Sequence, residues 1–217
     1  MSWTGFSLDL PSIGLASLSF LVGSIPFGVL ITRALGRKNP RQEGSGNIGA
    51  TNVSRVAGFW PAGLFTLVLD VSKGALPIFL ASAVGVSIWA PWVTAEGLLL
   101  GKSLQWRCGV LGVLGHCYSP WLRFEGGKGV ATAFGVFFAL TPISAGIALF
   151  TFIIVFLQTR VVSISSLSGM AVLLISDLAL YPIDVHSWVI GFIVFLVMIR
   201  HESNIDALLA ETEKSVP

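Results

Sequence analysis

Long apolar runs alternate with short polar segments along this chain. The first run covers about residues 13–35, the second about 58–84, and later ones about 130–158, 162–180 and 187–199. Each run is continuous instead of alternating between apolar and polar positions, which favours membrane-spanning helices and excludes an outer-membrane β-barrel. The pattern therefore predicts an all-α fold, in which the chain passes through a membrane several times.

The composition agrees with this pattern. Only 11% of the 217 residues are charged, 54% are hydrophobic, and the mean hydropathy is +0.84, whereas soluble domains carry about 25% charged residues. At about 20 residues for each span, the chain has room for roughly five to seven spans. We therefore expect a single membrane-embedded domain over residues 1–217, with no separate soluble domain.

The cysteines and histidines predict neither a disulfide nor a metal site. Cys108 and Cys117 lie nine positions apart on one expected helix, so their side chains cannot easily form a bridge. The sequence contains no Cys-x-x-Cys pair and no cluster of histidines and cysteines. We expect no metal and no other cofactor.

Basic residues give the expected orientation in the membrane. Arg33, Arg37, Lys38 and Arg41 cluster at the end of the first run, after a kink that we expect at Pro26. Because Lys and Arg favour the cytoplasmic side, this end is predicted to be cytoplasmic and the N-terminus to lie outside.

The run at 130–158 allows two topologies. It is either one long kinked helix or two short helices separated at Pro142. Two passes would place both Arg160 and Arg200 on the cytoplasmic side, so we favour two helices. A short segment at about 106–116 returns the chain inward after an outer interfacial loop over residues 87–106 with tryptophan anchors. The chain then has about seven spans and a cytoplasmic C-terminus.

Two charged residues lie inside the second run. Asp70 and Lys73 are three positions apart and therefore share one helical face. Opposite charges at this depth are expected to pair with each other or to serve a polar cavity. They form either a structural ion pair or a support for a functional site.

A glycine-rich segment just before residue 130 offers the strongest candidate chemistry. Three glycines surround a lysine, and a threonine follows: Gly126, Gly127, Lys128, Gly129 and Thr132. The backbone amides of such a loop, the start of a helix and an ammonium group together suit a phosphate-like anion. The spacing of a Walker loop is absent. The alternative is a simple turn between helices, with Lys128 extending to the membrane interface.

Four polar segments fall on the cytoplasmic side in this topology, and they cover residues 44–55, 116–132, 160–166 and 200–204. A soluble anion would bind there, and its apolar partner would come from the lipid. A transporter for a phosphorylated metabolite and a non-catalytic anion-binding subunit are the alternative functions. The transporter is disfavoured because the polar segments gather at one membrane face and the sequence shows no internal repeat.

Three motifs in these segments resemble those of the bacterial acyl-phosphate:glycerol-3-phosphate acyltransferase family. The first runs from Gly44 to Asn52, the second from Gly115 to Thr132, and the third from Arg200 to Ile205. The motifs follow one another in the family's order. With the proline-kinked first span and the Asp-x-x-Lys-Gly segment that starts at Asp70, the resemblance covers essentially the whole chain.

The chain departs from the family's usual pattern at three positions. Ile48 stands where the family usually has a proline, and Ala207 and Glu211 depart from its pattern in the tail. These departures do not change the reaction that the resemblance implies, which is described next, but the resemblance assigns no role to the tail.

The resemblance implies transfer of a fatty acyl group from acyl phosphate to glycerol 3-phosphate, which gives 1-acyl-glycerol 3-phosphate and phosphate. This is the first acylation step of phospholipid synthesis, and the family uses neither acyl-CoA nor acyl carrier protein. The implied partners are acyl phosphate from the bilayer, glycerol 3-phosphate from the cytoplasm and membrane lipid, with no nucleic acid. The implied location is the bacterial inner membrane, with the active site on the cytoplasmic face.

The expected site residues divide between the two substrates. We assign the acyl phosphate head group to the glycine-rich loop, namely Gly126, Gly127, Lys128, Gly129 and Thr132. By resemblance, glycerol 3-phosphate is held by Ser45, Asn47, Arg55, His201 and Asn204, with Ser163 or Ser166 lining the site. Arg55, Lys128 and His201 are the expected catalytic residues. The general base is His201, His116 or an oxygen of the acyl phosphate itself.

Overall fold

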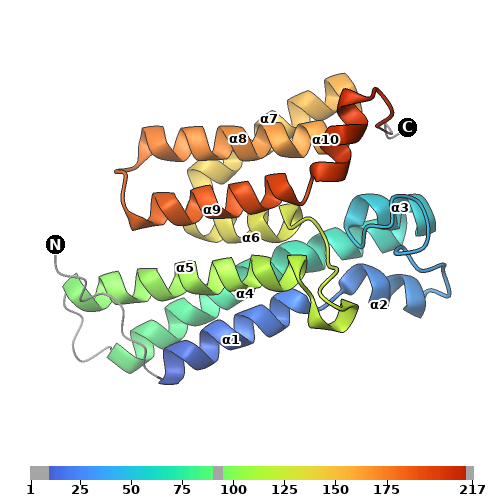
Figure 1. The fold of residues 1–217 in the computed structure, drawn as a ribbon. Helices are drawn as coiled ribbons and strands as arrows, with labels where there is room; N and C mark the ends of the chain where they lie inside the picture. Colours follow the sequence, from blue (N-terminus) through green and yellow to red (C-terminus); the bar gives the residue numbers. More distant parts are fainter. Residues whose placement is uncertain (1–9, 90–94, 214–217) are drawn as a thin grey trace. The chain divides into compact units, whose positions relative to one another are not determined.

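The computed structural model describes residues 10–89 and 95–213, and its regular elements in these ranges are helices (Figure 1). In chain order the helices are α1 (Leu10–Ser24), α2 (Phe27–Ala34), α3 (Ala50–Ala57), α4 (Leu64–Trp89), α5 (Ala95–Cys117), α6 (Val130–Leu140), α7 (Pro142–Thr159), α8 (Val162–Leu180), α9 (Val185–Ile199) and α10 (Glu202–Leu209). A π-helical turn over Phe59–Gly63 precedes α4, and a single 3-10 turn over Pro120–Leu122 follows α5.

The helices form two compact units, Met1–Leu140 and Thr141–Pro217. In the first unit α1 packs along α5, and α4 packs against both α5 and α6. In the second unit α7 lies along α8, and α8 lies beside α9 (Figure 1). The boundary coincides with the break at Pro142, so each proposed substrate-binding segment belongs to one unit or the other.

Several of the described helices are long and apolar enough to cross a membrane. Three qualify individually, over Phe59–Ala83, Pro142–Thr159 and Val162–Leu180, and up to five qualify if each bent helix pair forms one span. The prediction of an all-α membrane protein with several spans is confirmed. The number seven is not confirmed by this count of the described helices.

Prolines break the chain at the two places where the sequence predicted. The first bent pair, Ser12–Ser24 with Phe27–Ala34, turns by 44° around Pro26. At the second place α6 ends at Leu140, and α7 starts at Pro142 after a non-helical Thr141 with φ −133° and ψ 65°. A proline is favoured in the first turn of a helix and disrupts a helix interior. The preference for two helices over one long helix is therefore confirmed.

The prediction of an interfacial loop over residues 87–106 is wrong for the residues that the structure describes. Helix α4 continues to Trp89, and α5 already begins at Ala95; residues 90–94 lie outside the described ranges. The isolated charged residues in this stretch suggested a loop, but Glu, Lys, Gln and Leu are all good helix formers. Two short helices were also missed, α3 in the first polar segment and α10 in the polar tail.

Bare glycines allow the helices of the first unit to approach closely. A methyl group at Gly23 would collide with the carbonyl oxygen of Gly112, and one at Gly115 would collide with that of Phe20. These contacts join α1 to α5. Small residues at helix interfaces are typical of membrane proteins, where close backbone contact replaces the hydrophobic driving force between helices.

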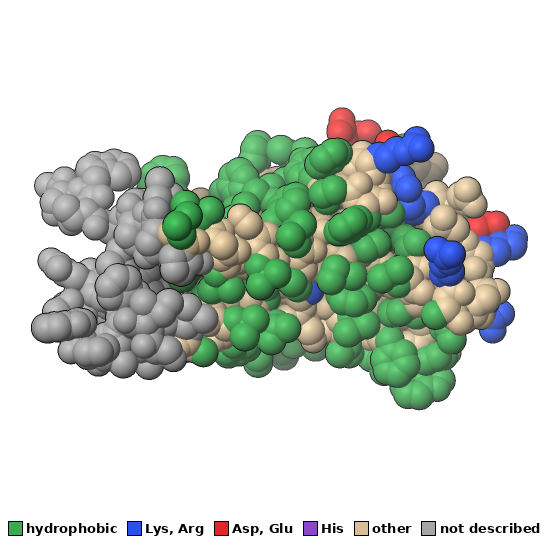
Figure 2. All heavy atoms as spheres, turned by 90° about the horizontal axis from the view of Figure 1, so that it is seen from below, with side chains coloured by type: hydrophobic (Ala, Val, Ile, Leu, Met, Phe, Trp, Pro, Cys, Tyr) green, Lys and Arg blue, Asp and Glu red, His purple; other side chains and the backbone are tan. Residues whose placement is uncertain are grey.

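The surface of the molecule divides by chemical type. Hydrophobic side chains cover the middle of the face drawn in Figure 2, and Lys and Arg gather at the end where Figure 1 places α2 and α3. The exposed apolar side chains include Leu21 on α1 and Leu76 and Phe79 on α4. Such a surface suits contact with lipid tails along the helices and with water and head groups at their basic end.

Candidate functional site

Asn52 organises the first polar segment of the first unit. Its buried side-chain amide donates to the carbonyl oxygens of Pro40, Glu43 and Asn47, at 2.8, 3.0 and 2.8 Å, and its side-chain oxygen accepts from the backbone amide of Ser45 at 2.8 Å. Two N–H groups thus serve three carbonyls, as a shared donor can. The motif from Gly44 to Asn52 does not by itself indicate this structural role for Asn52.

The predicted glycerol 3-phosphate residues of this segment stand on the loop that Asn52 holds. Ser45 is exposed, and Asn47 is fixed because its side-chain oxygen accepts from the amide of Gly49 at 2.8 Å. Arg55 is exposed in the last turn of α3.

Lys38 lies outside the spans, ahead of this segment. A 2.8 Å hydrogen bond from its ammonium group to Glu43 raises the pKa of Lys38 above its ordinary value.

The turn that leads to the glycine-rich loop is tied to other parts of the first unit. The hydroxyl of Ser119 donates to the carbonyl of Ser24 at 2.6 Å, next to the break in the first helix pair. The guanidinium of Arg41 pairs with the carboxylate of Glu125 at 2.8 Å. This ion pair joins Arg41, three positions before the first motif, to Glu125, directly before Gly126, so it connects the loop ahead of the first motif with the second motif.

Two glycines of the loop use their amides inside the protein. The backbone N–H of Gly127 donates to the carbonyl of His116 at 3.0 Å, and that of Gly126 donates to the carbonyl of Cys117 at 3.1 Å. These bonds satisfy carbonyls at the C-terminal end of α5. The amides of Gly126 and Gly127 were expected to point at an anion, and the structure instead uses them to close the loop onto α5.

Lys128 and its neighbours keep the features of an anion site. Lys128 is half-buried, and Gly129 has φ 87°, which favours glycine. Helix α6 starts directly afterwards, so its positive end lies at the loop. Among the described residues, the hydroxyl of Thr132 is buried without a hydrogen-bond partner, which a bound ligand or water could supply.

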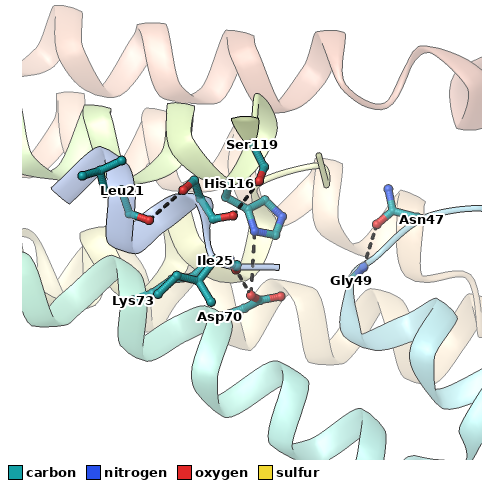
Figure 3. Close-up of polar contacts among 9 residues, drawn as sticks. Leu21, Ile25, Asn47, Gly49, Asp70, Lys73, His116 and Ser119 are labelled. Carbon is teal, nitrogen blue, oxygen red and sulfur yellow. Dashed lines mark hydrogen bonds and ion pairs between the residues drawn. The ribbon is translucent and has the colours of Figure 1, made fainter. Parts of the chain in front are cut away.

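A buried ion pair on α4 lies close to His116 at the end of α5 (Figure 3). The ammonium of Lys73 is 2.8 Å from the carboxylate of Asp70, with 2% and 3% of the side chains exposed, and it also donates to the carbonyl of Ile25 at 2.9 Å. The Nδ1 atom of His116 is 3.8 Å from the same oxygen of Asp70. The pairing expected for Asp70 and Lys73 is confirmed, and His116 joins it.

In the second unit, Glu213 holds together two predicted site residues, Ser163 and Asn204, and no role had been assigned to Glu213 from the sequence. One carboxylate oxygen of Glu213 accepts from the hydroxyl of Ser163 at 2.7 Å and from the side-chain amide of Asn204 at 2.6 Å. Ser163 is buried in α8, as is Ser166 one turn further on. The tail, to which no role had been assigned, therefore holds two predicted ligands in place.

His201 is oriented by the end of α9. Its buried ring is held by a 2.7 Å contact between Nδ1 and the carbonyl of Val197. A carbonyl only accepts hydrogen bonds, so Nδ1 carries the proton. In the neutral ring Nε2 is then an acceptor, which is the form needed to bind a hydroxyl group.

The predicted site residues thus divide between the two units. Ser45, Asn47, Arg55 and the glycine-rich loop residues belong to the first unit, and Ser163, Ser166, His201 and Asn204 to the second. Within the first unit, the ion pair of Arg41 connects the chain just before the first motif with Glu125 at the start of the glycine-rich loop. Within the second, Glu213 joins Ser163 to Asn204.

The chain is similar to known acyltransferases over nearly its whole length. A model of the glycerol-3-phosphate acyltransferase family matches residues 13–211. A glycerol-3-phosphate acyltransferase of Leptospira borgpetersenii is 42% identical over 205 residues, which cover 91% of this chain and 88% of the relative. One of Wolinella succinogenes is 36% identical and covers 95% of this chain and 97% of the relative.

Two solved structures have the same fold. The crystal structure of PlsY (YgiH), an integral membrane glycerol 3-phosphate acyltransferase, in its glycerol 3-phosphate form has a TM-score of 0.80 and 33% identity, covering 95% of this chain and 96% of that one. Its lysophosphatidic acid form has a TM-score of 0.77 and 31% identity. From its motifs, its helices and these relatives, the chain belongs to the glycerol-3-phosphate acyltransferase family and is an integral membrane enzyme that transfers an acyl group to glycerol 3-phosphate.

Proposed function

We propose that the acyl donor is acyl phosphate taken from the bilayer, and that Lys128 binds its head group. The observation that carries this proposal is the half-buried lysine beside the start of α6, in a loop tied to α5 and to the first polar segment. A small dianion fits an ammonium group at a helix N-terminus. The apolar surface of the neighbouring helices suits the acyl chain of the same molecule.

The chemistry requires positioning more than activation. Acyl phosphate is a mixed anhydride, so a hydroxyl oxygen of glycerol 3-phosphate attacks the carbonyl carbon directly. A new carbon–oxygen bond forms, the bond from that carbon to the phosphate oxygen breaks, and inorganic phosphate leaves. Two anionic head groups must be held together against their repulsion, and cationic side chains with fixed donors do this.

We assign glycerol 3-phosphate to the residues that the family's motifs imply, namely Ser45, Asn47, Arg55, Ser163, Ser166, His201 and Asn204. Arg55 provides the fork geometry that suits a phosphate. His201 offers Nε2 as an acceptor for a hydroxyl group of glycerol, and Asn204 follows it by one helical turn.

The proton of the attacking hydroxyl has two destinations. It passes either to Nε2 of His201 or to an oxygen of the phosphate that leaves. His116 is a weaker candidate, because its ring lies between the backbone of Gly127 and the carboxylate of Asp70. We assign His201 to positioning, since phosphate oxygens already stand beside the reacting hydroxyl.

We propose a seven-span topology with the N-terminus outside and the C-terminus in the cytoplasm. The bent pair of α1 and α2 ends in basic residues, which favours a cytoplasmic location for that end. The break between α6 and α7 supports two passes there, which would place both Arg160 and Arg200 on the cytoplasmic side. The site would then face the cytoplasm at the bacterial inner membrane, where glycerol 3-phosphate is available.

The donor is tested with the purified protein in detergent. Incubation with acyl phosphate and glycerol 3-phosphate should release lysophosphatidate and phosphate in equal amounts, and replacement of acyl phosphate by acyl-CoA should give neither product. Equal rates with acyl-CoA would contradict the proposed donor.

The role of Lys128 is tested by substitution in the same assay. Lys128→Ala should abolish the reaction, because loss of a charge-assisted contact in such a site costs about 2–4 kcal/mol. Lys38→Ala, at an exposed lysine, is the matched control and should remain active.

The topology is tested by labelling single cysteines in intact cells. Cysteines at Lys38, Thr159 and Ser203, all exposed positions, should be protected from a membrane-impermeant thiol reagent. A cysteine at Ile183, between α8 and α9, should react as the outer control. Labelling at Thr159 from outside would contradict the seven-span topology. Cys108 and Cys117 are buried and should give little background.

The role of His201 is tested by His201→Gln. Glutamine retains polar atoms near the position of Nε2, so a positioning role predicts partial activity with a raised KM for glycerol 3-phosphate. A general base would instead predict a kcat lowered at least about 100-fold with an unchanged KM. Steady-state kinetics with both substrates separates the two results. His186→Gln, at a half-exposed histidine beside Asp184, is the matched control and should behave as wild type.

The tail is tested at Glu213. Glu213→Ala leaves the donors of Ser163 and Asn204 without their common acceptor, and a hydrogen bond to a charged group is worth about 1.5–3 kcal/mol. The KM for glycerol 3-phosphate should rise about tenfold or more. Glu213→Gln keeps one acceptor oxygen and should lose less. Glu202→Ala removes an exposed acid from the same tail and should have no such effect. An unchanged KM in Glu213→Ala would show that the tail does not support the acceptor residues.

A further inference from the structure

One segment of α4, from Asp70 to Gly74, touches three other elements of the first unit. Lys73 donates to the carbonyl of Ile25, in the break between α1 and α2. Asp70 faces His116 at the end of α5 (Figure 3). Bare glycine at position 74 lets α4 approach the carbonyl of Thr132 at the start of α6. The segment therefore lies where the helices that carry the first two motifs meet.

The ion pair in this segment costs desolvation free energy, because both charged groups are removed from water. Asp70 and Lys73 are almost completely buried, and they bury two charges inside a predicted span. Replacing such a pair by apolar residues often leaves stability unchanged or improves it, so a buried pair is weak evidence of a stabilising role. Charged residues at this depth usually serve a function.

The contacts lead from Asp70 to Lys128 in two steps. The Nδ1 atom of His116 is 3.8 Å from the carboxylate of Asp70. On its other side the ring lies so close to Gly127 that a Cβ atom at that position would collide with Nε2. The carbonyl of His116 also accepts the amide of Gly127 at 3.0 Å. The side chain and the backbone of His116 therefore both define where Gly127 lies, and Lys128 is the next residue.

The start of α6 is held on the same part of α4. A side chain at Gly74 would collide with the carbonyl of Thr132, and one at Gly135 would collide with the carbonyl of Val71. The glycine-rich loop is thus fixed at both ends, by His116 at its beginning and by α6 at its end. Both anchors contact residues 70–74: His116 lies near Asp70, and the start of α6 packs on Val71 and Gly74.

We propose that Asp70 is a positioning residue for acyl transfer: through His116 it fixes the loop backbone at Gly127, and so the place of the Lys128 ammonium. This inference rests on the proposed role of Lys128 at the donor head group. Lys73 holds the carboxylate of Asp70 in place and ties the pair to the break between α1 and α2. Neither residue touches the substrate.

The test uses a variant that does not strand a buried charge. Asp70→Asn alone would leave Lys73 buried without its partner and could unfold the protein. The double variant Asp70→Asn/Lys73→Met removes both charges and keeps similar volumes. Its folding is checked by gel filtration and thermal unfolding in detergent. Asp177→Asn is the matched control, because Asp177 is an equally buried carboxylate in the second unit, beside Ser144.

The expected result is a change in the kinetics of one substrate only. In the folded double variant the KM for acyl phosphate should rise about tenfold or kcat should fall by about 10–100-fold, since small misplacements of a binding group have effects of this size. The KM for glycerol 3-phosphate should stay within about twofold, and Asp177→Asn should match wild type. His116→Gln should reproduce the defect, and adding it to the double variant should cause little further loss, since the residues act in series.

Two outcomes are decisive against the proposal. A folded double variant with wild-type constants for both substrates would overturn it. So would a loss that multiplies with that of His116→Gln, since independent effects multiply. Lys128→Ala is measured alongside. If that variant remains active, the donor assignment itself fails; if it is inactive while the double variant is normal, only the positioning role fails.

Discussion

The constraint on which this structure depends is that polar groups away from water need partners inside the protein. The break between α1 and α2 meets this need with side chains from other helices and loops. Lys73 binds the carbonyl of Ile25 and Ser119 binds that of Ser24, both at the break between α1 and α2. In the first polar segment, Asn52 binds three carbonyls that no helix satisfies. These irregular segments are therefore held by specific side chains.

Close backbone contact is the second element of this design. Glycines on α1, α4, α5 and α6 allow carbonyl groups of neighbouring helices to lie where a side chain would collide. In the glycine-rich loop the same property lets Gly127 lie directly on the ring of His116. The glycines beside Lys128 thus serve the fit between the loop and α5, and the amides of Gly126 and Gly127 are used for that fit.

Basic and acidic side chains have different partners in this protein, and the reaction gives a reason for the difference. Both substrates carry phosphate groups, so the enzyme needs cations to hold them together, and Arg55 and Lys128 are proposed for that task. Acidic side chains bind other groups of the protein. Glu125 pairs with Arg41 to join two loops, Asp70 pairs with Lys73 beneath one of them, and Glu213 orders Ser163 and Asn204. Each carboxylate is thereby occupied by a donor of the protein.

The sequence by itself determined the fold class, the helix breaks and the family. Long apolar runs specify membrane helices because lipid offers the backbone no partners, and Pro26 and Pro142 end helices because proline lacks an N–H group. The motifs identified the acyltransferase family, and helical periodicity placed Asp70 and Lys73 on one face. Only the tertiary structure decided that these two residues pair, which partners Asn52 and Glu213 bind, and that Gly126 and Gly127 turn their amides to α5. Contacts between residues distant in sequence depend on how helices pack, and local pattern carries no information on them.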